Sequence, residues 1–211
     1  AVRMGGPEVT GNMKLKLALA KAKANNVPKD NIQRAIQKGA GAQDGSNFEE
    51  ITYEGYGPAG VAVMVDALTD NRNRTAADVR HLFSKHGGNL GENGCVGWMF
   101  KRKGVFAIDG DAGYNEDDLM MLVLDAGAED LKSEDGAFEI TTEPEDFEAV
   151  EKVLADNNVA VMMSEISMIP DTMAELSPED AAKVQRLIDA LEDLDDVQDV
   201  FTNADLPDEE E

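Results

Sequence analysis

At 211 residues and 22.7 kDa, the chain has room for one large domain or two to three small ones, and its hydrophobic content of 42% excludes a disordered acidic protein. A single cysteine excludes an internal disulfide framework and is typical of a reducing compartment, so we expect a cytoplasmic protein. No apolar run approaches the roughly 18–20 residues that span a bilayer.

The formal net charge of −24 is distributed unevenly along the chain. Two segments are basic: residues 1–38 hold eight Lys/Arg and two Asp/Glu, and residues 71–103 hold seven Lys/Arg and two Asp/Glu. The other two segments are acidic: residues 39–70 hold no Lys/Arg and six Asp/Glu, and residues 104–211 hold four Lys/Arg and thirty-three Asp/Glu. This asymmetry predicts a basic N-terminal half that faces a polyanion. Attraction between the two halves, without any ligand, is the alternative explanation.

The first 45 residues are predicted to form a helical domain. Apolar residues at the spacing of one helix face indicate a first helix over residues 12–24, with a buried side formed by Leu15, Ala18, Leu19 and Ala22. A second helix begins at Pro28 and ends at Gly39, and its inner face is formed by Ile32, Ala35 and Ile36. A glycine-rich linker over residues 39–47 then closes the domain.

The next elements are a hairpin and a helix. Two β-rich runs joined by glycine and proline predict a hairpin over residues 51–65. Thr75, with Asp78 three residues on, resembles the N-cap of a helix that runs through His86 and ends at the glycine pair after it. The apolar run Cys95–Phe100 is predicted to be a strand in which the thiol is buried and unreactive.

The remainder of the chain follows a β-α-β-β-α-β pattern, which is typical of a ferredoxin-like fold. Ser177 then begins a further helix, and Val197–Thr202 is a last strand that would complete the middle part of the chain. We therefore expect an α+β protein of three domains. These are a helical domain (1–45), a discontinuous α+β domain (46–103 plus 172–206) and an inserted, acidic ferredoxin-like domain (104–171), followed by an acidic tail (207–211).

Catalytic motifs are absent from the sequence, which contains no nucleophile elbow, no His-Glu-x-x-His, no P-loop and no Cys-x-x-Cys. Asp109–Gly113 begins like a calcium loop, but Tyr114 replaces the required glycine and Met120 the bidentate glutamate. His81 fits an exposed basic stripe, and His86 fits the C-terminal end of a helix dipole. We therefore expect no enzyme, no metal and no cofactor.

Basic side chains of the N-terminal helices form the first candidate nucleic-acid surface, because point charges suit sequence-independent phosphate contacts. They are Lys14, Lys16, Lys21, Lys23, Lys29, Arg34 and Lys38. Few aromatic side chains accompany them, so base stacking is not expected there, and no helix is expected to present the Arg, Asn and Gln set that reads base edges. The alternative is that the lysines flank an apolar stripe and cover the core with their stems.

The run Asp70–Thr75 is the second candidate surface. It precedes the predicted helix, where free backbone N–H groups together with Arg72 and Arg74 could hold a phosphate. Pairing of these arginines with acids of the C-terminal half is an equal alternative. Arg80 and Lys85 on the following helix complete the set.

Six segments carry long and specific patterns: Tyr53–Pro58, Leu68–Arg80, Phe83–Gly91, Ala126–Asp130, Glu165–Pro170 and Arg186–Gln198. Together they resemble the YebC/PmpR family over essentially the whole chain. The resemblance implies a helical N-terminal domain, two α+β domains and no agreed catalytic residues. It also implies a basic segment of the type Gly-His-Ser-Lys-Trp ahead of Ala1, so we expect residues before this one and an intact protein less acidic than −24.

The resemblance leaves two functions open. Bacterial members carry the label probable transcriptional regulatory protein, with DNA binding attributed to them. A mitochondrial member activates translation of cytochrome c oxidase subunit one, and some bacterial relatives look like translation factors acting at stalled ribosomes. The hypotheses are therefore a DNA-binding transcriptional regulator and a ribosome-associated translation factor that binds ribosomal RNA. The acidic half, which long DNA would repel, suits the second somewhat better.

Overall fold

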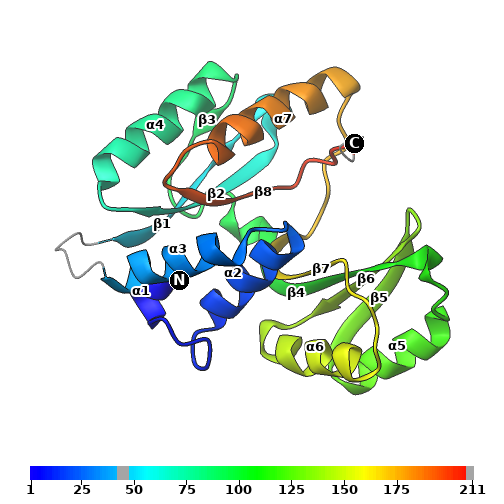
Figure 1. Ribbon diagram of the computed structural model, residues 1–211. Helices are drawn as coiled ribbons and strands as arrows, with labels where there is room; N and C mark the ends of the chain where they lie inside the picture. The colour runs from blue at the N-terminus through cyan, green and yellow to red at the C-terminus, as the bar shows by residue number, and fades with distance from the viewer. Residues whose placement is uncertain (42–47, 208–211) are drawn as a thin grey trace. The chain divides into compact units, whose positions relative to one another are not determined.

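The computed structural model describes residues 1–41 and 48–207, and it confirms the predicted α+β fold class. The chain divides into two compact units: unit 1 is Ala1–Ser46 with Arg102–Ser167, and unit 2 is Asn47–Lys101 with Met168–Glu211 (Figure 1). The division into three domains stays a prediction. The linker expected at residues 42–47 and the tail expected at 208–211 lie outside the described residues. Within the described part of the chain, no helix has the length and apolar character needed to cross a membrane.

Unit 1 begins with the helices α1 (Val2–Gly5), α2 (Met13–Ala24) and α3 (Lys29–Gly41). The buried side chain of Asn12 ties the first two together. Its Oδ1 accepts from the N–H of Leu15 at 3.1 Å, and its amide donates to the carbonyls of Ala1 at 3.2 Å and Gly6 at 2.8 Å. The predicted first helix is thus confirmed, with an asparagine N-cap.

Two details of these helices differ from the prediction. α3 continues through Gly39 and ends at Gly41. The missing Cβ of Gly39 leaves room for α1, since a Cβ there would lie 3.0 Å from the Cβ of Val2. Ala18 and Ala35, expected on buried faces, are exposed, whereas Leu17 packs against the core beneath the sheet of unit 1. Leucine decides how a helix is oriented because it buries far more apolar area than alanine does.

The sheet of unit 1 has the strand order β5-β6-β4-β7. Its strands are β4 (Phe100–Asp109), β5 (Ala128–Glu134), β6 (Ala137–Thr142) and β7 (Met163–Pro170), of which β4 and β7 also contribute residues to unit 2. Helices α5 (Glu116–Asp125) and α6 (Phe147–Asp156) connect them, and short 3₁₀ helices lie at Gly110–Ala112 and Pro144–Asp146. The order β-α-β-β-α-β with β4 and β6 central is that of the predicted ferredoxin-like motif.

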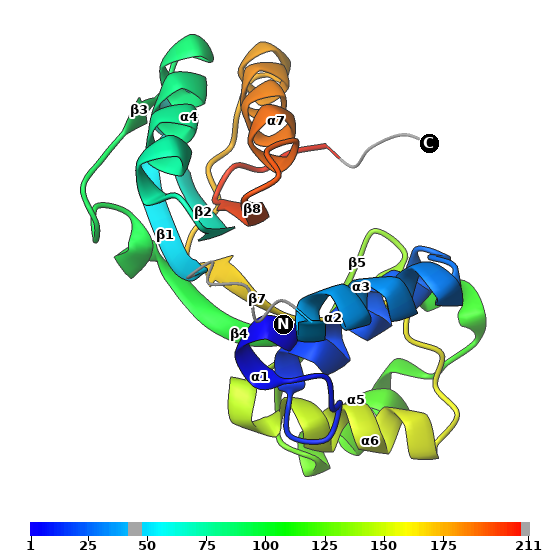
Figure 2. The same cartoon turned by 60° about the vertical axis from the view of Figure 1, so that its left-hand side comes forward.

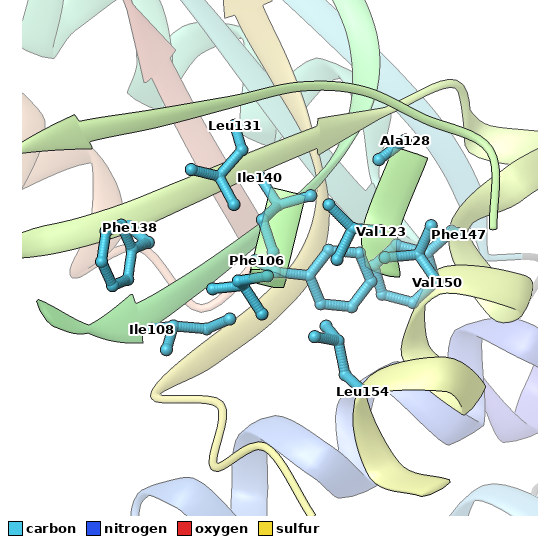
Figure 3. Packing of buried hydrophobic residues seen from close by; sticks show 11 residues of the cluster. Phe106, Ile108, Val123, Ala128, Leu131, Phe138, Ile140, Phe147, Val150 and Leu154 are labelled. Atoms are coloured by element: carbon cyan, nitrogen blue, oxygen red, sulfur yellow. The ribbon is translucent and has the colours of Figure 1, made fainter. Parts of the chain in front are cut away.

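A buried apolar cluster joins this sheet to its two helices (Figure 3). Phe106 of β4 and Phe147 at the start of α6 stack with their ring centroids 4.7 Å apart and their planes at 17°. Val123, Ile140 and Leu154 are fully buried in the same cluster. Each such side chain contributes roughly 1.5–3 kcal/mol of burial energy, so the acidic part of the chain has a core of its own.

The sheet of unit 2 has the order β3-β1-β2-β8. Its strands are β1 (Glu49–Tyr56), β2 (Ala62–Thr69), β3 (Asn89–Leu90) and β8 (Val197–Thr202). The predicted hairpin is the antiparallel pair β1–β2, which turns through a 3₁₀ segment at Pro58–Gly60. β8 lies antiparallel beside β2, so C-terminal residues complete a sheet that begins before the inserted segment.

Helices α4 (Arg72–Lys85) and α7 (Pro178–Glu192) cover one face of the unit 2 sheet (Figure 2). Val63 and Val65 of β2 point to this face and pack in one cluster with Phe83 and Leu187 from the two helices. Ala62 and Met64, which alternate with these valines along β2, are buried on the opposite face of the sheet, as the period of two in a strand requires.

Two predictions for unit 2 are wrong. α4 has Asn71 as its N-cap, whose Oδ1 accepts from the N–H of Arg74 at 3.1 Å, whereas Thr75 is buried inside the helix. The run Cys95–Phe100 is not a strand: Gly97–Met99 form a 3₁₀ helix, and β4 begins at the phenylalanine. The N–H groups that a strand would offer to a neighbour are bound here by the carboxylate of Glu54.

Gly104 of β4 gives a test of the packing in unit 1. It is buried, and a Cβ there would lie 2.7 Å from Cδ2 of Phe147. We expect Gly104→Ala to lower the free energy of unfolding in urea by about 1–3 kcal/mol through overpacking. Ser133→Ala, at an exposed position of β5, is the control and should change it by less than about 0.5 kcal/mol. Equal stability of Gly104→Ala and the unsubstituted chain would contradict the tight packing of this site.

Candidate nucleic-acid interface

Helices α2 and α3 carry the predicted basic side chains. The exposed ones are Lys14, Lys21, Lys23, Lys29, Arg34 and Lys38. Lys16 is half-buried, and its Nζ donates to Oε2 of Glu151 on α6 at 2.8 Å. This hydrogen bond raises the pKa of Lys16 above its ordinary value. Part of the predicted charge is therefore neutralised inside unit 1.

Four of the exposed cations form no ion pair with a described carboxylate. Within residues 1–41 and 48–207, no carboxylate lies at ion-pair distance from Lys23, Lys29, Arg34 or Lys38. Arg34 and Lys38 are four residues apart and therefore share a side of α3. A phosphate could bind these groups without breaking an existing ion pair.

α3 also exposes three amide side chains, those of Asn31, Gln33 and Gln37. Asn and Gln can bind adenine, and Arg can bind guanine, through paired hydrogen bonds in the major groove of DNA. α3 thus exposes Asn and Gln side chains beside Arg34, and the expectation that no helix reads base edges stays a prediction. The signal lay in the composition of its solvent face, whereas the apolar stripe alone predicted only a helix.

The arginines of the second candidate surface pair with acids. Arg74 Nη2 lies 3.0 Å from Oδ1 of Asp70 and 2.9 Å from Oδ2 of Asp196. Arg72 Nη1 lies 3.7 Å from Oε2 of Glu49. Both arginines stand in the first turn of α4 rather than before it. A phosphate-binding role for this turn stays a prediction, and any phosphate would compete with these carboxylates.

The carboxylate of Asp196 organises the region around this turn. Its Oδ2 accepts from the hydroxyl of Thr75 at 2.7 Å as well as from Arg74, and Thr69 lies within 3.4 Å of it. Burial alone would raise the pKa of Asp196, but the hydrogen bonds from Arg74 and Thr75 outweigh burial and lower it below its ordinary value. This contact joins α4 to the loop that precedes β8.

A cavity of about 490 Å³ beside the turn is lined by Arg74, Thr75, Asp78, Asp193, Leu194, Asp195 and Asp196. Four carboxylates and one guanidinium give it a negative character, which disfavours a phosphate inside it. Farther along α4, Arg80, His81 and Lys85 are exposed. The basic character of α4 is therefore concentrated in its later turns.

Sequence reasoning missed a loop between β3 and β4. Glu54 of β1 is buried, and its carboxylate accepts from the N–H of Gly94 at 2.5 Å, from that of Val96 at 3.3 Å and from that of Gly97. The loop presents Trp98 to solvent, 72% exposed. No local pattern predicts this, because the acceptor lies some forty residues before the donors.

Metal-ligand clusters and reactive thiols are two common features of catalytic sites. Among the described residues, no group of three or more His, Cys, Asp or Glu side chains is placed to hold a metal ion. Cys95 is half-buried in a turn, and burial, aided by the charge of Glu54, raises the pKa of its thiol above the ordinary value. A raised pKa keeps the thiol protonated near neutral pH, which disfavours its use as a nucleophile.

Asp196 predicts a pH-dependent contribution to stability. Its folded-state pKa is lowered, so its stabilisation is complete above the ordinary Asp pKa of about 3.9 and is lost as the pH falls through the folded value. We expect Asp196→Asn to lower the free energy of unfolding at pH 7 by about 1–2 kcal/mol, and this deficit to narrow below about pH 4.

The measurement is urea unfolding at several pH values. Asp195→Asn is the matched control, because this neighbour lines the same cavity and is exposed. It should show little deficit at any pH. A deficit of Asp196→Asn that is the same at pH 7 and at pH 3 would contradict the assigned contact.

Comparison with known proteins covers nearly the whole chain. The model of the TACO1/YebC protein N-terminal domain matches residues 1–42, and that of the TACO1/YebC second and third domain matches residues 48–204. A probable transcriptional regulatory protein of Desulforamulus reducens is 56% identical over 96% of this chain and 84% of its own length, and one of Symbiobacterium thermophilum is 55% identical over 98% and 86%. The crystal structure of a conserved hypothetical protein from Aquifex aeolicus matches with a TM-score of 0.82 at 45% identity, covering 99% of this chain and 86% of that one. This chain therefore belongs to the TACO1/YebC family, the YebC/PmpR family that its sequence resembles.

Proposed function

We propose that this chain is a non-enzymatic regulator of gene expression that acts in the cytoplasm and binds nucleic acid through the exposed side of α2 and α3. The observation that carries the proposal is the set of exposed cations without an acidic partner among the described residues, Lys23, Lys29, Arg34 and Lys38. Because no described carboxylate holds them in an ion pair, each can release counterions from a phosphate backbone on binding.

Charge elsewhere in the chain supports this orientation. Residues 104–211 hold thirty-three acidic and four basic residues, so a polyanion would be repelled by most of that part. Lys103 in that neighbourhood is already bound to Glu129 at 2.8 Å and to Glu143. Repulsion from the acidic part and attraction to α3 would together orient the protein on its target.

Transcriptional regulation through DNA is the first form of the proposal. The curated relatives from D. reducens and S. thermophilum are named probable transcriptional regulatory proteins. The solvent side of α3 supports it, since Gln33 and Gln37 lie four residues apart beside Arg34 and supply the donors and acceptors that read base edges.

A ribosome-associated translation factor that binds ribosomal RNA is the second form. The acidic half favours it, because a long duplex would repel that half, whereas a ribosome offers basic proteins beside its RNA. The partner under both forms is nucleic acid, and the cations of α2 and α3 have the same role in each.

Neutralising the four cations tests the shared part of the proposal. We expect the combined change Lys23→Gln, Lys29→Gln, Arg34→Gln and Lys38→Gln to weaken binding to duplex DNA and to structured RNA. The slope of log affinity against log salt should flatten by about 0.9 for each lost phosphate contact on DNA. Binding is measured by fluorescence anisotropy across a salt series.

The control variant carries Lys152→Gln and Lys183→Gln. Both lysines are exposed on helices, and each already bonds an acid of its own helix, Asp156 at 2.5 Å and Glu179 at 2.9 Å. This variant loses two positive charges from other parts of the chain and should keep the original slope. If the slope and affinity of the four-cation variant also stay unchanged, α2 and α3 are not the interface.

The amides of α3 separate the two forms. If the chain reads DNA, the duplexes that it selects from a random library should share a sequence. The double change Gln33→Ala and Gln37→Ala should then lower the preference for that sequence by about 1–3 kcal/mol per lost contact. The affinity for random DNA should stay the same. Gln198→Ala, an exposed glutamine of β8, is the control. A library without enrichment, together with co-sedimentation with ribosomes that survives excess random DNA, would overturn the transcriptional form and support the second.

A further inference from the structure

Two exposed aromatic side chains of unit 2 meet at one carbonyl oxygen. Nε1 of Trp98 donates to the carbonyl of Cys95 at 3.1 Å, and the hydroxyl of Tyr56 donates to the same oxygen at 3.2 Å. The tryptophan is 72% exposed and the tyrosine 39%. The polar group of each ring is therefore satisfied internally, while much of the apolar ring surface remains in water.

The loop that carries Trp98 is fixed by buried contacts. The carboxylate of Glu54 accepts from the N–H groups of Gly94, Val96 and Gly97, and its carbonyl accepts from the N–H of Gly91 at 2.9 Å. A Cβ on Gly97 would lie 2.6 Å from Oε1 of Glu54, so a larger residue would displace the carboxylate that holds the loop. An aromatic group held this way loses little conformational entropy when a ligand stacks on it.

The surroundings favour a nucleic acid over a protein partner. Among the described residues of unit 2, the large apolar side chains exposed to solvent are those of Tyr56, Trp98 and Met173, which is too few for the apolar centre of a protein interface. Arg80 and Lys85 are exposed on α4, and the turn after that helix reaches the backbone of the tyrosine through Gly88. Glu92 is the single acidic residue between positions 80 and 101.

We propose that Trp98 and Tyr56 form a stacking site for an unpaired nucleobase. The proposal rests on nucleic-acid binding by this chain and adds that part of the ligand is single-stranded. Bases within a duplex already stack on their neighbours, whereas an unpaired base of RNA or DNA presents its face to an aromatic ring. Arg80 and Lys85 are exposed cations of the same unit and would attract the phosphates of such a strand.

Intrinsic fluorescence gives a direct test, because Trp98 is the single tryptophan of the chain. The full chain is titrated with an unpaired RNA oligonucleotide, its DNA counterpart, the same RNA annealed to its complement, and heparin as a polyanion without bases. We expect quenching by the unpaired strands and little by the duplex or heparin. Quenching by either unpaired strand supports the proposal, and the stronger quencher identifies the source of the base.

Variants separate stacking from charge. Trp98→Leu should weaken binding of the unpaired strand by about 10-fold, and Trp98→Phe should keep most of the affinity, since a ring remains. Met173→Ala removes another exposed apolar side chain of unit 2 and should bind as the unsubstituted chain does. Circular dichroism checks that each variant is folded. Because Trp98 is exposed, we expect its replacement to leave the fold intact.

The outcomes distinguish this proposal from the one on which it rests. If the unsubstituted chain binds no nucleic acid, both are overturned. If it binds RNA without quenching and Trp98→Leu binds equally well, the stacking site alone is overturned, and the interface on α2 and α3 stands. Equal quenching by duplex and unpaired strands would also overturn the stacking site.

Discussion

The loop of unit 2 that carries Trp98 depends on one buried carboxylate, that of Glu54. Placing a charge inside a protein costs several kcal/mol unless donors replace the lost water. Glu54 meets this cost with three backbone N–H groups of the loop between β3 and β4. Those groups are then lost to any neighbouring strand, so the segment turns, places Trp98 in solvent and returns to the core at Phe100, where β4 begins. The shape of the loop and the exposure of its aromatic side chain are therefore two results of the same contact.

Some basic side chains of the N-terminal half pair with acids of the same chain, and others have no such pair among the described residues. Lys16 and Arg74 are bound by Glu151 and Asp196, which lie far along the chain in its acidic half. Attraction between the halves is thus present at these two positions. The cations of α3 differ from these, because no carboxylate of the described residues lies at ion-pair distance from Lys29, Arg34 or Lys38.

Elements with local signals were predictable from the sequence. The helices that follow Asn12, Asn115 and Ser177 each begin with a side chain that accepts from a backbone N–H three residues on, and the helix lies where that signal puts it. The start of α4 was not predictable in this way, since Asn71 and Thr75 are both good caps and the choice is made by Asp196, which holds the threonine inside the helix. The same limit applies to the candidate site. Its cations could be read from the sequence, whereas the pairing of Lys16 and the loop held by Glu54 depend on residues distant in the chain.

Because the ferredoxin-like segment lies between two parts of the unit 2 sheet in sequence, the strands of unit 1 are synthesised before unit 2 is complete. β2 finds its partner β8 only near the C-terminus, where Thr202 lies opposite Val63. Chains emerge N-terminus first, so every strand of the unit 1 sheet is available once β7 has left the ribosome, while unit 2 must wait for α7 and β8. During that interval one edge of β2, among the most apolar strands of the protein, lacks its neighbour and can pair with strands of other chains. The last part of translation is therefore the period in which this protein is most exposed to aggregation.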